Sequence, residues 1–183
     1  MFGFSRTGFS HKFTWKISGK PSRSVRCCLA RTYQALSSAS RDDLWQKLTD
    51  LTDVSWHPLL ASTNVPRGLV AKPGLIYEAV TRLIPIPIQI FVEQVWPGEL
   101  LSVRILVLPG LEEQVTYEVK SSVCGTYVSY SVTLRGWLSP LAWSLLRPHA
   151  ASVAARLVQA TEQAALQAVS GQLKPSKHSC LDF

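Results

Sequence analysis

The sequence predicts an α+β fold in which a curved antiparallel sheet of about seven strands wraps around a long C-terminal helix. Short strand-like runs with alternating apolar and polar residues fill the middle of the chain. Pro- and Gly-rich turn signals separate these runs so closely that no crossover helix fits between them, which favours antiparallel pairing. An Ala-rich segment, His149 to Val169, then follows without Gly or Pro and suits a long helix.

Length and composition fit one folded domain with a tail at each end. A chain of 183 residues can bury a hydrophobic core without disulfides or metal. Apolar residues make up 46% and charged residues 17%, which excludes a disordered chain. We expect a basic, flexible N-terminal tail over residues 1–23, the domain over residues 24–173 and a short C-terminal tail over residues 174–183.

The net charge of +7 comes from the N-terminal segment. Met1 to Arg41 contains eight Lys or Arg and no acid, whereas the rest of the chain has 11 basic and 12 acidic residues. The body therefore has no basic field for a phosphate backbone, and we expect no nucleic-acid partner. The chain is expected to be cytoplasmic, although the acid-free, Ser-rich start resembles an organelle transit peptide. Peripheral membrane contact and the oligomeric state stay open.

The first elements are a strand and two short helices. Ser24 to Ala35 has apolar residues at even spacing, as a strand requires. Ser40 is a suitable N-cap for a helix whose first turn carries Asp42 and Asp43. Asp53 is expected to cap a second short helix that ends before Pro58.

Five strand-like runs and one shorter run then form a meander. The short strand is expected between Ala61 and Leu69. The alternation gives each of the later strands one apolar face, which we expect to be buried, and one polar face. The five runs are Leu75 to Arg82, Ile88 to Val95, Leu101 to Leu108, Gln114 to Ser121 and Thr126 to Leu134.

The last part of the chain predicts the covering helix. Leu138 to Arg147 is expected to form one or two apolar helical turns, and Pro148 to stand in the first turn of the next segment. His149 to Val169 carries an apolar stripe that includes Val153 and Leu157.

The order of these elements resembles the START-like superfamily, also called SRPBCC or polyketide-cyclase-like, which has the helix-grip fold. Local signatures support the resemblance over about residues 24–173, and their order is more specific than any one of them. The resemblance implies a cavity between sheet and helix that holds a hydrophobic ligand or hosts a cyclase, and it carries over no catalytic residue. The signatures are Asp43-Leu44-Trp45, Ser55-Trp56-His57-Pro58, Val95-Trp96-Pro97-Gly98 with Leu100 to Val103, and Leu134 to Leu138 through Leu146.

Few residues suggest catalysis or cofactor binding. No nucleotide-binding, zinc-protease or serine-hydrolase motif occurs, Cys27, Cys28, Cys124 and Cys180 form no C-x-x-C pair, and we predict no cofactor and no metal. His57 could act as an acid or base at the cavity mouth, but a turn residue bonded to backbone is the interpretation we prefer. His149 is interpreted in the same way, and Glu78, Glu93, Arg104 and Arg135 are expected to face water.

The inward apolar set is the positive evidence for a function. Its tyrosines would give a hydrophobic pocket a few polar groups. We expect these residues to line a ligand cavity: Tyr77, Ile90, Val92, Val103, Ile105, Val115, Tyr117, Val128, Tyr130, Leu146, Val153 and Leu157.

Three functions remain open. The first, which we favour, is non-catalytic binding, transport or sequestration of a hydrophobic small molecule such as a lipid, quinone, pigment or isoprenoid. The second is a cyclase or dehydratase acting in the same cavity, which would need at least two titratable groups converging there. The third is an interaction module with a filled core, recruited to a partner or membrane through the basic tail.

Overall fold

The computed structural model describes residues 28–172, apart from the side chains of residues 107–108 and 169–172. One seven-stranded antiparallel sheet has the order β1-β7-β6-β5-β4-β3-β2, a meander whose last strand also pairs with the first. The predicted α+β fold is thereby confirmed, while both predicted tails fall outside the described residues. The elements are β1 (Cys28–Ser37), α1 (Arg41–Thr49), β2 (Leu60–Thr63), β3 (Ile76–Thr81), β4 (Pro87–Trp96), β5 (Leu100–Leu108), β6 (Leu111–Ser122), β7 (Gly125–Arg135) and α2 (Ser139–Gln172).

The sheet buries one face and leaves the other wet, as the alternation predicts. Along β6, residues from Leu111 to Val119 are buried at every second position, and those between them are less buried. The wet face carries Arg104, which pairs with Glu93 at 2.8 Å. Register shifts between Val92 and Gln94 and between Leu106 and Leu108 interrupt the ladder and help the sheet to curl.

Helix α1 begins as predicted, but the second short helix is a turn. Ser40 caps α1 by accepting a hydrogen bond from the Asp43 N–H at 3.1 Å. The prediction of a helix capped by Asp53 is wrong because Asp53 binds the Ser55 N–H and hydroxyl instead, at 3.1 and 2.6 Å. This local turn competes with helical hydrogen bonds, and Pro58 prevents the chain from continuing as a helix.

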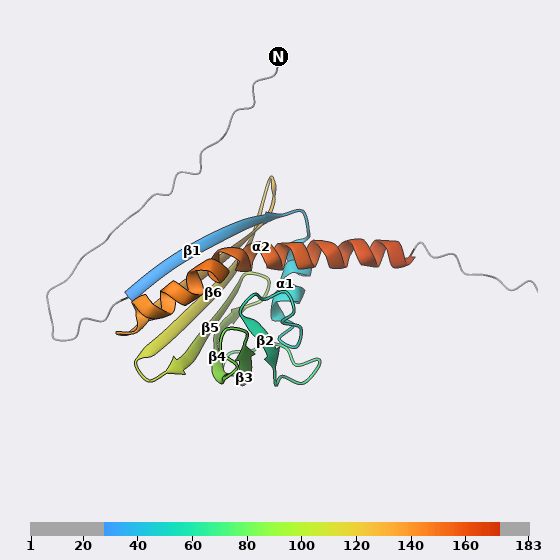
Figure 1. Cartoon of the computed structure of the whole chain (residues 1–183). Helices are drawn as coiled ribbons and strands as arrows, with labels where there is room; N and C mark the ends of the chain where they lie inside the picture. The colour runs from blue at the N-terminus through green and yellow to red at the C-terminus, as the bar shows by residue number, and fades with distance from the viewer. Residues whose placement is uncertain (1–27, 173–183) are drawn as a thin grey trace, which may run out of the picture.

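Helix α2 is one continuous element with Pro148 inside it, rather than two segments that meet at the proline. It crosses one face of the sheet next to β1, and its orange N-terminal part and red C-terminal part run in different directions (Figure 1). The missing N–H and the ring of Pro148 account for such a bend, because both disrupt the bond to the preceding turn. Val153 and Leu157, after the proline, are fully buried against the sheet.

Two glycines bring the β5–β6 turn against the start of α2. A Cβ added to Gly136 would lie 1.9 Å from the carbonyl oxygen of Gly110, and Gly136 has a φ of +126°. Only glycine permits both this backbone and this approach. Between residues 28 and 172, no helix has the length and hydrophobicity to cross a membrane.

Candidate functional site

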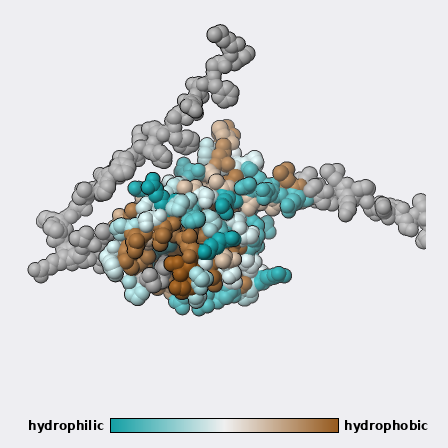
Figure 2. Space-filling model, viewed as in Figure 1, coloured by the Kyte–Doolittle hydropathy of each residue, from teal (hydrophilic) through white to brown (hydrophobic). Residues whose placement is uncertain are grey.

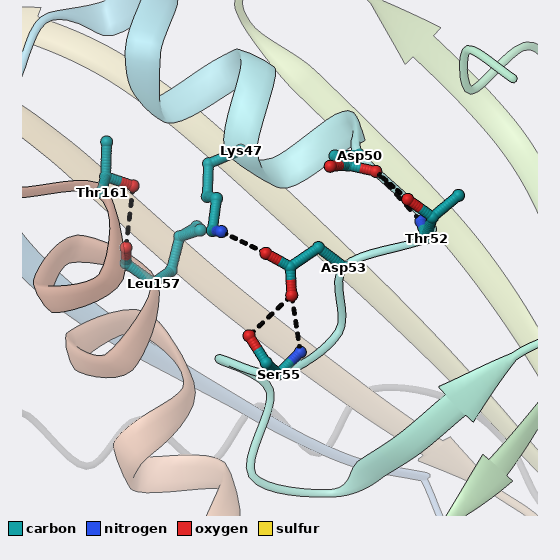
Figure 3. Close-up of polar contacts among 7 residues, drawn as sticks. All are labelled: Lys47, Asp50, Thr52, Asp53, Ser55, Leu157 and Thr161. Carbon is teal, nitrogen blue, oxygen red and sulfur yellow. Dashed lines mark hydrogen bonds and ion pairs between the residues drawn. The ribbon is translucent and has the colours of Figure 1, made fainter. Parts of the chain in front are cut away.

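The turn between α1 and β2 positions the first two residues of the site. Lys47 of α1 forms an ion pair with Asp53 at 2.5 Å, and the other carboxylate oxygen of Asp53 holds Ser55 (Figure 3). These contacts, led by the Lys47 hydrogen bond, lower the pKa of Asp53 to about 2. The chain therefore leaves α1 in a fixed turn that directs Trp56 and His57 into the interior, where both are buried.

His57 is held as a neutral imidazole. Its Nδ1 accepts hydrogen bonds from the backbone N–H groups of Leu59 and Leu60, at 3.2 and 3.3 Å. The ring proton is therefore on Nε2, which donates to the hydroxyl of Tyr117 at 3.1 Å. Burial, with Arg82 as a second cause, lowers the pKa of His57 to about 3. This supports the backbone-bonded turn residue that the sequence favours, and an imidazole in this state is a poor base at neutral pH.

An aromatic cluster surrounds this histidine. The ring centroids of Tyr117 and Tyr130 lie 5.3 Å apart, and those of Trp56 and Tyr117 lie 6.4 Å apart in an edge-to-face arrangement. The sheet sets this geometry, because Tyr117 and Tyr130 are direct cross-strand partners and Tyr33 is the next residue in the same row. Burial raises the pKa of Tyr117 and of Tyr130 well above the usual value, so both hydroxyls stay protonated.

Trp56, His57, Tyr117 and Tyr130 border a cavity of about 360 Å³ between the sheet and the N-terminal part of α2. Its walls come from β2 to β7, from the end of α1 and the turn after it, and from α2 before Pro148. The size lies at the lower end of the range for small-molecule sites. The walls are mostly aliphatic, with polar groups from the histidine and the tyrosines among them.

Five apolar lining residues are also exposed to solvent, and we call them the entrance rim. The hydrophobic side chains on the face shown in Figure 2 gather beside the N-terminal part of α2. Exposed apolar groups around an opening are typical of ligand-binding grooves. The entrance rim consists of Leu83, Ile84, Ile86, Leu141 and Leu145.

Sequence reasoning missed Glu113, which also lines the cavity. It lies on the buried face of β6 between Leu111 and Val115, and only 6% of it is exposed. Burial raises its pKa to about 7. The signal was available, because extending the alternation of Val115 and Tyr117 by one step toward the N-terminus reaches Glu113. The predicted strand, however, began one residue later, at Gln114.

The structure brings most of the predicted cavity residues together. Four of the predicted set, Val92, Val128, Val153 and Leu157, are buried in packed core and do not border the cavity. The middle of α2, from Ala150 to Thr161, packs into the core, so the open space lies beneath its N-terminal part instead. The predicted residues that do line the cavity are Tyr77, Ile90, Val103, Ile105, Val115, Tyr117, Tyr130 and Leu146.

Comparisons identify the fold. No protein-family model and no curated protein matches the chain. A protein from Mesorhizobium loti of known structure is 16% identical, with a TM-score of 0.62 over 74% of this chain and 98% of that one. Norcoclaurine synthase from Thalictrum flavum is 12% identical, with a TM-score of 0.58 over 85% and 99%. Ara h 8.0201 is 10% identical, with a TM-score of 0.59 over 75% and 99%. The chain thus has the predicted helix-grip fold, which it shares with these solved structures.

Proposed function

We propose that this protein binds a hydrophobic small molecule, of the lipid, quinone, pigment or isoprenoid kind, in the cavity beneath the N-terminal part of α2. The observation that carries the proposal is the cavity itself, about 360 Å³ with mainly aliphatic walls. Well-packed interiors leave few voids larger than a water molecule, so a space of this size needs a reason. Burial of apolar ligand surface would supply the affinity, at about 25 cal/mol per Å².

The entrance rim supports this proposal. Leu141 and Leu145 are 63% and 53% exposed although they belong to a helix whose middle, at Val153 and Leu157, is fully buried. Together with Ile84 and Ile86 they give a hydrophobic molecule an apolar path from solvent to the interior. The cavity also counts against the hypothesis of an interaction module with a filled core.

Binding of N-phenyl-1-naphthylamine, an uncharged dye that fluoresces in apolar sites, tests the proposal on the full chain. We expect saturable fluorescence enhancement that is lost in Val103→Trp, because Val103 lines the cavity and the larger ring fills it. Val70→Trp is the matched control, since Val70 is 70% exposed and does not line the cavity. Equal dye binding by the two variants would reject the cavity as the binding site, and native mass spectrometry would show whether a ligand co-purifies.

An acid–base enzyme is a second candidate, because titratable groups do converge in the cavity. Glu113 and the hydroxyls of Tyr77, Tyr117 and Tyr130 come from β3, β6 and β7. A carboxyl group with a pKa near 7 suits general acid or base work at neutral pH, whereas His57 does not. Norcoclaurine synthase, an enzyme by its name, has the same fold. Turnover of a cyclisable substrate that is lost in Glu113→Gln, with dye binding unchanged, would favour this candidate.

A further inference from the structure

Glu113 is a buried carboxyl group with no hydrogen-bonding or charged side-chain partner in the described part of the chain. The cavity wall contains one other carboxylate, Asp50, which is exposed and already accepts hydrogen bonds from the Thr52 N–H and hydroxyl at 3.1 and 2.6 Å. Glu113, in contrast, has no hydrogen bond or ion pair to any side chain that the structure describes, and no described Lys or Arg lines the cavity. Nothing on the wall therefore balances its charge.

A glutamate at this position carries a high free-energy cost when it ionises. The neighbours of Glu113 on the buried face, Leu111 and Val115, show that an aliphatic side chain would suit the strand. Ionising a buried carboxyl group without a partner costs several kcal/mol in a protein interior. A ligand group that enters the cavity and pairs with Glu113 would remove this cost and explain the choice of residue.

The surroundings of Glu113 favour a cation over an anion. Its charge acts on Tyr117 and Tyr130, so it lies within electrostatic range of both phenol rings. Aromatic faces carry negative partial charge and attract ammonium groups. An anionic head group would meet a carboxyl group, phenol rings and a neutral His57, with no positive side chain on the wall. The other titratable groups facing the cavity are Asp50 at the end of α1 and Tyr77 of β3, while β4, β5 and α2 contribute none.

We propose that the ligand of this cavity is a hydrophobic molecule with a basic nitrogen, and that the Glu113 carboxylate binds the protonated nitrogen. This inference rests on the proposed function, because it assumes that the cavity takes up a hydrophobic ligand. The ammonium group lies among the tyrosines and donates to the carboxylate, while the hydrocarbon part extends toward the entrance rim. Charge-assisted hydrogen bonds of this kind are stronger than neutral ones.

Displacement of N-phenyl-1-naphthylamine by three probes of equal chain length provides the test. The probes are 1-octylamine, 1-octanol and octanoate, compared at about pH 8 and about pH 5.5, on either side of the Glu113 pKa of about 7. At the higher pH we expect 1-octylamine to displace the dye at roughly tenfold lower concentration than 1-octanol, with octanoate weakest. The preference for the amine should shrink at the lower pH, because the amine stays charged while Glu113 becomes neutral.

Two variants assign the effect to Glu113. Glu113→Gln keeps the shape and removes the charge, so it should abolish the amine preference and leave 1-octanol binding in place. Glu112→Gln changes the adjacent residue, which pairs with Arg104 on the wet face, and should keep the preference. Equal displacement by amine and alcohol in the unmodified protein would overturn the inference alone. Absence of binding by the dye and by all three probes would overturn the proposed function with it.

Discussion

The stability of the protein should depend on pH through Glu113. Burial raises the pKa of this carboxyl group from 4.5 to about 7, so the folded state holds its proton in a range where the unfolded state has released it. The stabilisation is fully present below pH 4.5 and is lost as the pH rises through about 7. One pKa unit corresponds to about 1.4 kcal/mol, so this shift predicts a loss of about 3 kcal/mol across the range.

Urea unfolding of Glu113→Gln and of the unmodified protein, followed between about pH 4 and about pH 8, measures this loss. The difference in unfolding free energy between the two should change by about 3 kcal/mol in favour of the Gln variant as the pH rises. Other titrating groups contribute equally to both proteins and cancel. Glu112→Gln should run parallel to the unmodified protein. A pH-independent difference between Glu113→Gln and the unmodified protein would show that the carboxyl group is not desolvated, and would refute the reasoning.

Three further substitutions test the site and its supports by urea unfolding. Tyr117→Phe should lower the free energy of unfolding by about 1–3 kcal/mol, because it leaves the buried His57 Nε2–H without its acceptor. Tyr127→Phe, at an exposed position, is the control and should change it by less than about 0.5 kcal/mol. Equal effects of the two substitutions would argue against the His57–Tyr117 bond. Gly136→Ala should lower the free energy of unfolding by about 3 kcal/mol or more, because the added Cβ meets backbone. Gly68→Ala, where the added Cβ points into open space, should lower it by only about 1 kcal/mol. A loss as small as this in Gly136→Ala would contradict the close approach of Gly110 and Gly136. Leu157→Ala should cost about 2–5 kcal/mol, since Leu157 is fully buried; a loss below about 1 kcal/mol would mean that this part of α2 is loosely packed.

The sheet could be predicted from the sequence because polar and apolar residues alternate along the strands of the meander, most regularly in β6. Polar and apolar residues change places at every step from Val115 to Val119, and the structure buries the predicted face. The turn residues between the runs made the antiparallel order predictable, because they leave room only for hairpin connections. These signals are local, and the local rules agree with the final fold.

The errors arise where tertiary contacts or side-chain bonds override local rules. Pro148 suggested a boundary, yet packing on either side keeps α2 continuous and the proline only bends it. Asp53 looked like a helix cap, yet Lys47 and Ser55 engage it in a turn. Sequence periodicity also told which residues point inward but not how closely the helix approaches. It therefore could not separate Val153, in solid core, from Leu146, at the cavity wall.

The contact between Gly110 and Gly136 fixes the backbone next to Leu111, a residue of the cavity wall. Main chain meets main chain at this contact, because a Cβ on Gly136 would fall 1.9 Å from the Gly110 carbonyl oxygen, and rotation of side chains cannot separate the two segments. At the entrance rim, in contrast, Ile84 and Ile86 of the β3–β4 connection are 50% and 57% exposed and can change rotamer without moving the sheet. Bulkier residues there would slow the exchange of a bound molecule while leaving the interior, and the equilibrium with it, largely as it was.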